Sequence, residues 1–432
     1  MKIKLEPLKP ALCAAADDLH VIVRLQSDST NEGPRVPLNL ALVIDRSGSM
    51  GGPRLEAAKD CALDLVNRLA DDDRVALVTY DGAVQTVLEL SPVQMARPIA
   101  QHTISQVRAG GSTDLHAGWQ RGAALLAPSA IDSAVCHVIL LSDGHANRGL
   151  TEAGEIARII GDLADRGITT TTVGIGTGFN EHLMTEMAQA GRGRAHYGER
   201  AIDLAETFDA EIGLLTQLQW RNIRMDIEDA RADVQMMNRY IRTEAGWQMP
   251  SVATDSECWA MLRIPMDRAR RQQGRYGTAL TIVVQATDAQ GRPHEYRASL
   301  DTLPEIDWIE YGNLPENPLV ARRRLELQAA ELQFRIRDAV QRWEWHEAEA
   351  LFEELERLGR HEPWIAASLP YLRRLIAERD QVRTSKELNY KGISLGMRLA
   401  AVNETAFTEE GAAKEAAFLR RKSISGRRTG GQ

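Results

Sequence analysis

A chain of 432 residues exceeds the roughly 250 to 300 residues at which a single hydrophobic core stops growing, so we expect two or three folded units. Its hydrophobic fraction of 44% and charged fraction of 26% match ordinary globular proteins, which excludes wholesale disorder. A formal net charge of −8 argues against a surface built to bind nucleic-acid phosphates, so we expect no nucleic-acid partner.

The N-terminal stretch and the hydropathy pattern favour a cytoplasmic protein. Pro7, Pro10, Asp17 and Asp18 interrupt the N-terminal stretch before the apolar region of a signal peptide can form. No run of about 18 apolar residues is present, so we expect no membrane contact. The cysteines form no CxxC pair, which is typical of reduced, buried thiols rather than of a zinc site or a secreted disulfide module.

The first long segment, residues 38–214, alternates short apolar runs with helical patterns. Strands are predicted at 38–44, 74–80, 83–90, 136–142, 168–175 and 194–198, and helices at 54–70, 93–107, 114–127, 151–167, 180–190 and 201–215. Strands that alternate with helices of this length indicate βαβ units. We therefore predict an α/β fold with a doubly wound, Rossmann-like and mostly parallel sheet, covered by helices on both faces.

The rhythm then changes to short alternating runs over residues 215–312, which predicts a small antiparallel β-sandwich. The early run at 19–27 has the same character, so the segment 1–37 is predicted to add a strand to this sandwich. The α/β domain would then be an insertion into a β domain.

A helical region is predicted over residues 318–410. Apolar residues recur at helical spacing over 318–359, with Pro318 suited to a helix start, and a second helix at 362–380 should pack back as a hairpin. The tail, 411–432, is basic and glycine-rich and should be flexible. Two arginines precede Ser423 there, so Ser423 or Ser425 is a candidate phosphorylation site.

Oxygen-bearing side chains follow two of the predicted strands of the α/β domain. Asp45, Ser47 and Ser49 come directly after the strand 38–44, Asp143 follows the strand 136–142, and Thr113 lies before a helix after two loop glycines. Ligands of open α/β sheets bind at the carboxyl ends of the strands. Carboxylates and hydroxyls without imidazole or thiolate suit a hard cation such as Mg²⁺, with Mn²⁺ or Ca²⁺ as alternatives.

The pattern Asp45-x-Ser47-x-Ser49, with Thr113 in "GGSTDL" and Asp143 in "LLSDG", resembles the metal-ion-dependent adhesion site of von Willebrand factor type A (VWA) domains. The resemblance covers roughly residues 38 to 213. It implies that the two serines bind the cation directly, that Thr113 and Asp143 bind directly or through water, and that Asp45 acts mainly through water. It also implies an open coordination position that receives an Asp or Glu carboxylate from a partner protein.

The resemblance extends to the order of the segments, which is similar to bacterial stand-alone proteins labelled calcium-activated chloride channel homologues. Without a membrane span we do not expect a channel. We expect instead a cytoplasmic scaffold or adaptor that is not an enzyme and that binds a partner through the metal. Its partner-binding rim is predicted at Arg46, Met50, Asp114 and His145, although Asp114 also suits a helix cap.

Two other functions stay open. One is a metal-dependent phosphohydrolase in which Asp45, Asp143 and His145 act on a metal-bound water. The other is an accessory subunit of an AAA+ ATPase or of a kinase and phosphatase signalling set. The chain has no GxxxxGK[ST] motif, so any P-loop ATPase would be a separate partner.

Overall fold

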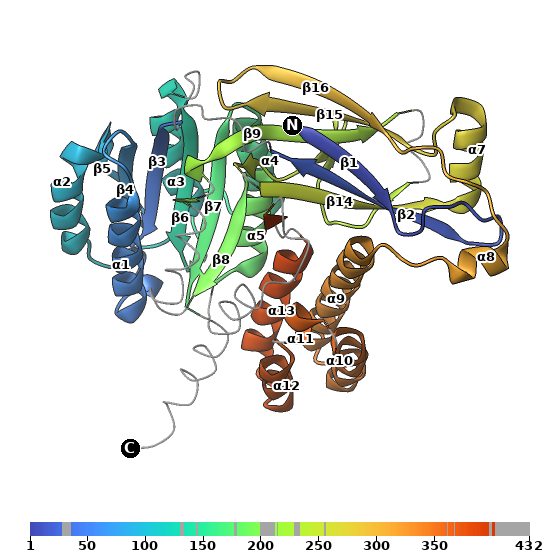
Figure 1. Ribbon diagram of the computed structural model, residues 1–432. Helices are drawn as coiled ribbons and strands as arrows, with labels where there is room; N and C mark the ends of the chain where they lie inside the picture. The colour runs from blue at the N-terminus through green and yellow to red at the C-terminus, as the bar shows by residue number, and fades with distance from the viewer. Residues whose placement is uncertain are drawn as a thin grey trace. The chain divides into compact units, whose positions relative to one another are not determined.

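The computed structural model of the chain (Figure 1) describes most of the sequence. The described residues are 1–27, 36–129, 134–143, 146–176, 179–198, 212–213, 215–228, 234–254, 256–360, 362–366, 368–396 and 400–401. Residue contacts divide the chain into two compact units. One unit comprises residues 32–218 with 289–292, and the other comprises residues 1–31, 219–288 and 293–432.

The first unit is built on one six-stranded sheet with the order β5-β4-β3-β6-β7-β8. All neighbouring strands in this sheet are parallel except β5, an antiparallel edge strand. The strands are β3 (Leu38–Asp45), β4 (Arg74–Tyr80), β5 (Val84–Pro92), β6 (Val135–Ser142), β7 (Ile168–Ile175) and β8 (Arg192–Gly198). β3 and β6 are buried along their whole length, as expected for central strands with both faces covered.

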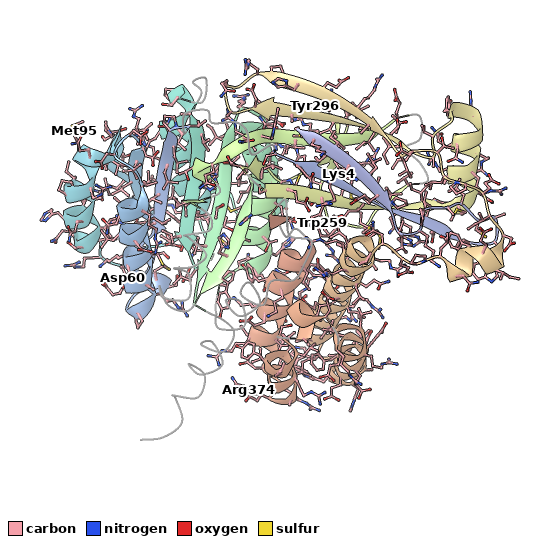
Figure 2. All side chains as sticks on the ribbon, viewed as in Figure 1. Lys4, Asp60, Met95, Trp259, Tyr296 and Arg374 are labelled. Carbon is pink, nitrogen blue, oxygen red and sulfur yellow. The ribbon has the colours of Figure 1, made fainter. Side chains whose placement is uncertain are left out.

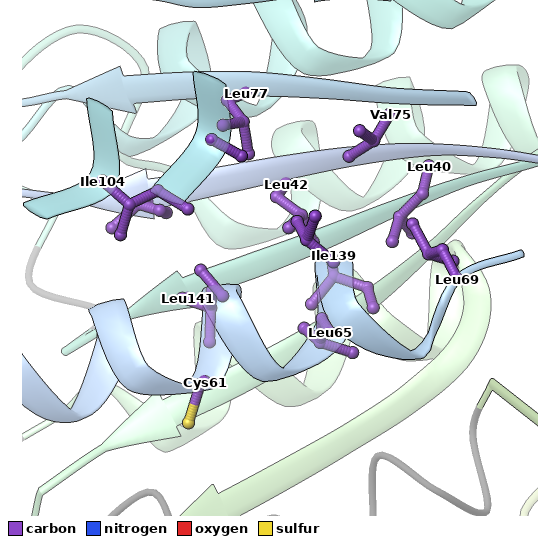
Figure 3. Close-up of a cluster of buried hydrophobic side chains, with 14 of the residues drawn as sticks. Leu40, Leu42, Cys61, Leu65, Leu69, Val75, Leu77, Ile104, Ile139 and Leu141 are labelled. Carbon is purple, nitrogen blue, oxygen red and sulfur yellow. The ribbon is translucent and has the colours of Figure 1, made fainter. Parts of the chain in front are cut away.

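Helices cover both faces of this sheet. They are α1 (Pro53–Arg68), α2 (Val93–Gln106), α3 (Leu115–Leu126), α4 (Ala153–Asp165) and α5 (Glu181–Ala190). Leu40, Leu42 and Ile139 form the core on the face that α1 and α2 cover, and Figure 3 shows them beside Leu65 of α1. On the opposite face, a Cβ atom at Gly122 of α3 would lie 2.5 Å from Val43, so glycine lets this helix approach the sheet closely.

The second unit contains two antiparallel sheets. The first comprises β1 (Lys2–Pro7), β2 (Asp18–Gln26), β14 (Ser256–Pro265), β10 (Gln235–Met236) and β17 (Ala400–Ala401). The second comprises β11 (Arg242–Thr243), β12 (Gly246–Gln248), β9 (Leu218–Ile227), β15 (Thr281–Asp288), β16 (Pro293–Ser299) and β13 (Val252–Ala253). Because β2 pairs with β14 over nine residue pairs, the N-terminal segment is a central part of the first sheet.

Side-chain alternation explains how these sheets pack. Val21 and Val23 lie on the face of β2 that packs toward the second sheet. They share one buried core with Met225 of β9 and Val284 of β15. Ile22 of β2 and the residue Trp259 (labelled in Figure 2) point to the other side. They join a separate cluster with α9 (Pro318–Gln341), so the first sheet is covered on both faces.

The C-terminal segment is helical, but it contains more helices than the periodicity predicts. The predicted helix 318–359 is divided into α9 and α10 (Trp345–Gly359). The break falls at Trp343, whose φ of 64° is incompatible with a continuous helix. The predicted helix 362–380 is likewise divided into α11 (Pro363–Ala366) and α12 (Leu369–Ala377), and a further helix, α13 (Gln381–Gly396), follows.

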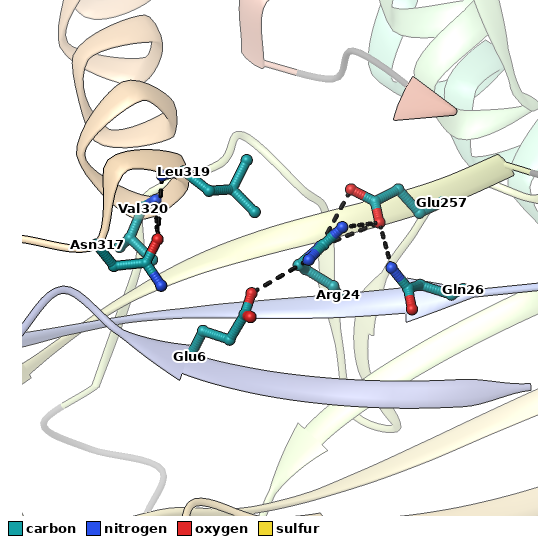
Figure 4. Close-up of polar contacts among 7 residues, drawn as sticks. All are labelled: Glu6, Arg24, Gln26, Glu257, Asn317, Leu319 and Val320. Carbon is teal, nitrogen blue, oxygen red and sulfur yellow. Dashed lines mark hydrogen bonds and ion pairs between the residues drawn. The ribbon is translucent and has the colours of Figure 1, made fainter. Parts of the chain in front are cut away.

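Two shorter helices lie before α9, namely α7 (Met266–Tyr276) and α8 (Trp308–Asn313). Asn317 caps the start of α9 by accepting hydrogen bonds from the backbone N–H groups of Leu319 at 3.0 Å and Val320 at 3.4 Å (Figure 4). In the part of the chain that the structure describes, no helix is long and apolar enough to cross a membrane.

These elements confirm the predicted fold class, a doubly wound α/β sheet with antiparallel sheets and a C-terminal helical region. The boundaries proposed between domains stay predictions. The tail predicted to be flexible, with Ser423 and Ser425, lies outside the described residues, as does most of the helix predicted at 201–215.

Candidate metal centre

The predicted ligands come from three loops at one edge of the α/β sheet. β3 ends at Asp45, and Asp143 directly follows β6. The two strands are parallel neighbours, with Ile44 opposite Leu141, so their carboxyl ends meet at this edge. The third loop carries Thr113 into α3.

Asp45 is fixed by hydrogen bonds at the end of β3. Its Oδ1 accepts from the backbone N–H of Ser47 at 2.8 Å, and its Oδ2 accepts from the hydroxyl of Ser142 at 2.6 Å. Burial raises the pKa of the Asp45 carboxyl, and nearby Asp143 adds to the rise, while the two serines oppose it. Since protein donors already engage both oxygens, the geometry suits the indirect, water-mediated role that the VWA resemblance implies for Asp45.

The two serines after β3 bring their hydroxyls together. Ser47 Oγ lies 3.2 Å from Ser49 Oγ across the short 3₁₀ turn Gly48–Met50. The backbone N–H of Gly48 donates to the carbonyl of Gly111 at 3.1 Å, which joins this turn to the loop that carries Thr113. The pair of hydroxyls and the threonine loop are therefore held as one structure.

Thr113 is held against the segment that follows β6. Its backbone N–H donates to the Asn147 side chain at 2.8 Å, and its carbonyl accepts from the N–H groups of Asn147 and Arg148 at 3.1 and 3.2 Å. These bonds tie the threonine loop to the loop of Asp143. Thr113 is almost fully buried.

Asp143 is the least satisfied of the predicted ligands. Its side chain has no exposed surface, and its Oδ1 has no hydrogen-bond partner among the described residues. Among the described residues, its Oδ2 contacts only a guanidinium nitrogen of Arg54, at 3.5 Å. A buried carboxylate with so few partners is costly, and a cation beside it would offset that cost. The residues therefore fit an oxygen-bound cation.

The carboxylates at this edge are too few to bind a cation by themselves. Within the described ranges, no group of three or more His, Cys, Asp and Glu side chains is placed to hold a metal. A cation here would depend on the serine and threonine hydroxyls and on water, which suits Mg²⁺ better than Zn²⁺.

The predicted rim is only partly where we expected it. Arg46 is half-buried and forms an ion pair with Asp81 at 3.2 Å. Asp114 caps α3 by accepting from Ala117 N–H at 3.1 Å. Met50 is fully buried and belongs to the hydrophobic core of the α/β sheet. Its side chain is therefore not part of an exposed rim. His145 lies outside the described residues.

Three residues at this edge were missed by the sequence reasoning. Ser142 binds Asp45, Asn147 binds Thr113, and Arg54 contacts Asp143. Ser142 carries the only local signal, because it is a hydroxyl that ends an apolar strand next to a predicted ligand. The other two act across loops, which local sequence does not reveal.

Residues 39–210 match the family model described as the von Willebrand factor type A domain. The chain carries a VWA domain. Among curated proteins, this chain is similar to the uncharacterized protein sll0103 of Synechocystis sp., with 32% identity over 44% of this chain and 44% of that protein. It is 26% identical to human inter-alpha-trypsin inhibitor heavy chain H3 over 40% of this chain and 20% of that protein. The chain thus spans less than half the length of these relatives.

Two solved structures share the fold over most of the chain. A von Willebrand factor type A protein from Catenulispora acidiphila aligns with a TM-score of 0.62 and 17% identity, covering 89% of this chain and 88% of its own. The ArnB paralog VWA2 from Sulfolobus acidocaldarius aligns with a TM-score of 0.58 and 17% identity, covering 91% of this chain and 99% of its own. The combination of a VWA domain with antiparallel sheets and helices therefore occurs in other proteins.

Proposed function

We propose that this VWA-domain protein binds a partner protein through a divalent cation at the Asp143 edge of its sheet. VWA domains are protein-interaction modules in many homologues, and this supports a binding role. The single observation that carries the metal-dependent form is the buried Asp143 carboxylate, whose Oδ1 has no partner among the described residues. The predicted ligand set is Asp45, Ser47, Ser49, Thr113 and Asp143.

The chemistry of these residues favours Mg²⁺, with Mn²⁺ or Ca²⁺ as alternatives. Two carboxylates and three hydroxyls offer oxygen ligands, and Mg²⁺ usually keeps part of its shell for water or for a guest oxygen. A bound cation would supply positive charge with a coordination position open to an external ligand. The ligand of matching chemistry is an Asp or Glu side chain of the partner. The β-sandwich and the helices would add scaffold surface.

The proposal predicts that partner capture depends on metal and on Asp143 together. The full chain should retain a partner from native lysate in millimolar Mg²⁺ and lose it in EDTA, and Asp143→Asn should lose it in both. Asp60→Asn is a control, since this residue is exposed on α1. A partner retained equally by Asp143→Asn and in EDTA would contradict the metal-bridged mode and would favour binding on the sandwich or the helices.

We also propose that the site binds and does not catalyse. A single oxygen-bound cation without a positioned base lacks the usual parts of a hydrolase. Phosphoester and nucleotide substrates should therefore be inert at millimolar Mg²⁺. Hydrolysis that disappears in Asp143→Asn would instead support the phosphohydrolase alternative.

A role as an accessory subunit of an AAA+ ATPase or of a kinase and phosphatase set is compatible with this binding device. We propose a cytoplasmic location, which the burial of all four cysteines and the lack of a CxxC pair in the sequence support. Recovery of the protein from the extracellular fraction of its native cells would overturn the location.

A further inference from the structure

We propose that Arg54 is a built-in competitor of the metal: its guanidinium holds the Asp143 carboxylate when no cation is bound and must leave when a cation binds. This inference rests on the proposed function and concerns the regulation of the same site. It makes Arg54 a residue that sets the metal affinity without being a ligand.

The contacts of Arg54 reach two of the loops that supply the predicted ligands. Arg54 lies in the first turn of α1, directly after Pro53. One of its terminal nitrogens donates to the backbone carbonyl of Ser49 at 3.1 Å and lies 3.5 Å from Asp143 Oδ2. A positive charge thus already bridges the ends of β3 and β6, where the cation is expected.

The side chain of Arg54 is guided to this position by a third strand. Gly176, directly after β7, has a φ of +77°, and a Cβ atom there would lie 2.9 Å from Arg54 Nε and 3.3 Å from Arg54 Cδ. Any other residue at 176 would therefore displace the arginine. The aliphatic part of the Arg54 side chain thus lies against the backbone of Gly176, which favours a specific position for this arginine.

The geometry of the ion pair between Arg54 and Asp143 would allow a cation to displace the guanidinium. Asp143 has no exposed surface, whereas the Arg54 side chain is 36% exposed and can swing into solvent. The contact is long and engages one carboxylate oxygen, so Oδ1 keeps no partner in the described part of the chain. A cation bound to Asp143 would repel the guanidinium, so the two contacts oppose each other. Opposed contacts are coupled reciprocally: each weakens the other by the same factor.

Arg46 provides a matched control beside the same candidate metal site. It carries the same charge and directly follows Asp45 in the sequence, but its guanidinium pairs with Asp81 at 3.2 Å and not with a predicted ligand. Arg46→Gln therefore reports the effect of removing one nearby positive charge, and Arg54→Gln adds to this the loss of the competing contact.

The test measures metal affinity and stability of the full chain after EDTA treatment and dialysis. Calorimetric titration with Mg²⁺, and separately with Mn²⁺, should show binding about fivefold tighter in Arg54→Gln than in wild type. Arg46→Gln should change affinity by no more than about twofold, as expected for a charge without direct contact. Without metal, Arg54→Gln should lower Tm by about 2 to 4 °C, since Asp143 loses its partner. At saturating Mg²⁺ this difference should vanish.

The possible outcomes separate the inference from the proposed function. Wild-type binding with unchanged or weaker affinity in Arg54→Gln would overturn the competitor role and leave the metal site standing. Equal gains in Arg54→Gln and Arg46→Gln would also overturn it, because bulk charge would explain both. Measurable binding in Arg54→Gln alone would support it, as the competitor would then dominate in wild type. No binding in any of the three would overturn the inference and the proposed function together.

Discussion

Glu257 and Asp143 are both buried carboxylates, but they differ in the number of hydrogen bonds that their oxygens accept. Glu257 on β14 accepts hydrogen bonds from the Arg24 guanidinium at 2.7 to 3.2 Å and from the Gln26 amide at 2.7 Å (Figure 4). In the described part of the chain, the Asp143 side chain has only its 3.5 Å contact with Arg54. Burial alone therefore does not mark a functional carboxylate, and the two residues differ in how well their oxygens are hydrogen-bonded.

The Glu257 network gives a stability prediction. Glu257→Gln removes the buried negative charge that pairs with Arg24, a residue of β2 that is itself almost fully buried. Only the half-buried Glu6 then compensates the guanidinium, at 3.2 Å, and breaking a buried ion pair is strongly destabilising, so the free energy of unfolding should fall by about 3 kcal/mol. Urea unfolding followed by circular dichroism measures this loss.

Glu6→Gln is the matched control, because Glu6 binds the same guanidinium at 3.2 Å but its side chain is 32% exposed. Its loss should cost about 1 kcal/mol or less. Similar costs for the two variants would mean that burial of the carboxylate does not decide the strength of this ion pair.

At the scale of the elements, uninterrupted apolar runs were the most informative signal. β3 and β6 were predicted because such runs are long enough for buried strands, and the site then followed from what comes after each run. β7 is less obvious, since its run of threonines is polar yet buried. The structure satisfies their hydroxyls individually: Trp119 donates to Thr170 at 3.0 Å, and Thr172 donates to the carbonyl of Met184 at 2.7 Å.

Local sequence patterns do not predict some other features of the structure. Helical periodicity continues across Trp343 although the backbone turns there, because the apolar residues on both sides still face one core. The position of Arg54 depends on Gly176 and Asp143, which directly follow different strands and lie far from Arg54 in the sequence. Contacts of this kind arise from the topology of the sheet, so a motif predicts the ligands but not the residue that opposes them.

At the scale of the whole molecule, the decisive question is whether the chain binds one cation at the carboxyl edge of its α/β sheet. A VWA domain provides the framework, and antiparallel sheets and helices surround it in sequence. Binding restricted to the folded state would also raise the free energy of unfolding, by about 2.7 kcal/mol when the ion is at 100 times its Kd.

The most direct measurement is calorimetric titration of the EDTA-treated full chain with Mg²⁺, in wild type and in Asp143→Asn. We predict one binding site per chain in wild type and no measurable binding in the variant, because Asp143 is the buried carboxylate whose Oδ1 has no partner among the described residues. Asp81→Asn, which alters a neighbouring carboxylate that pairs with Arg46, should still bind. Binding of Mg²⁺ by Asp143→Asn with wild-type affinity would contradict the assignment of the metal site.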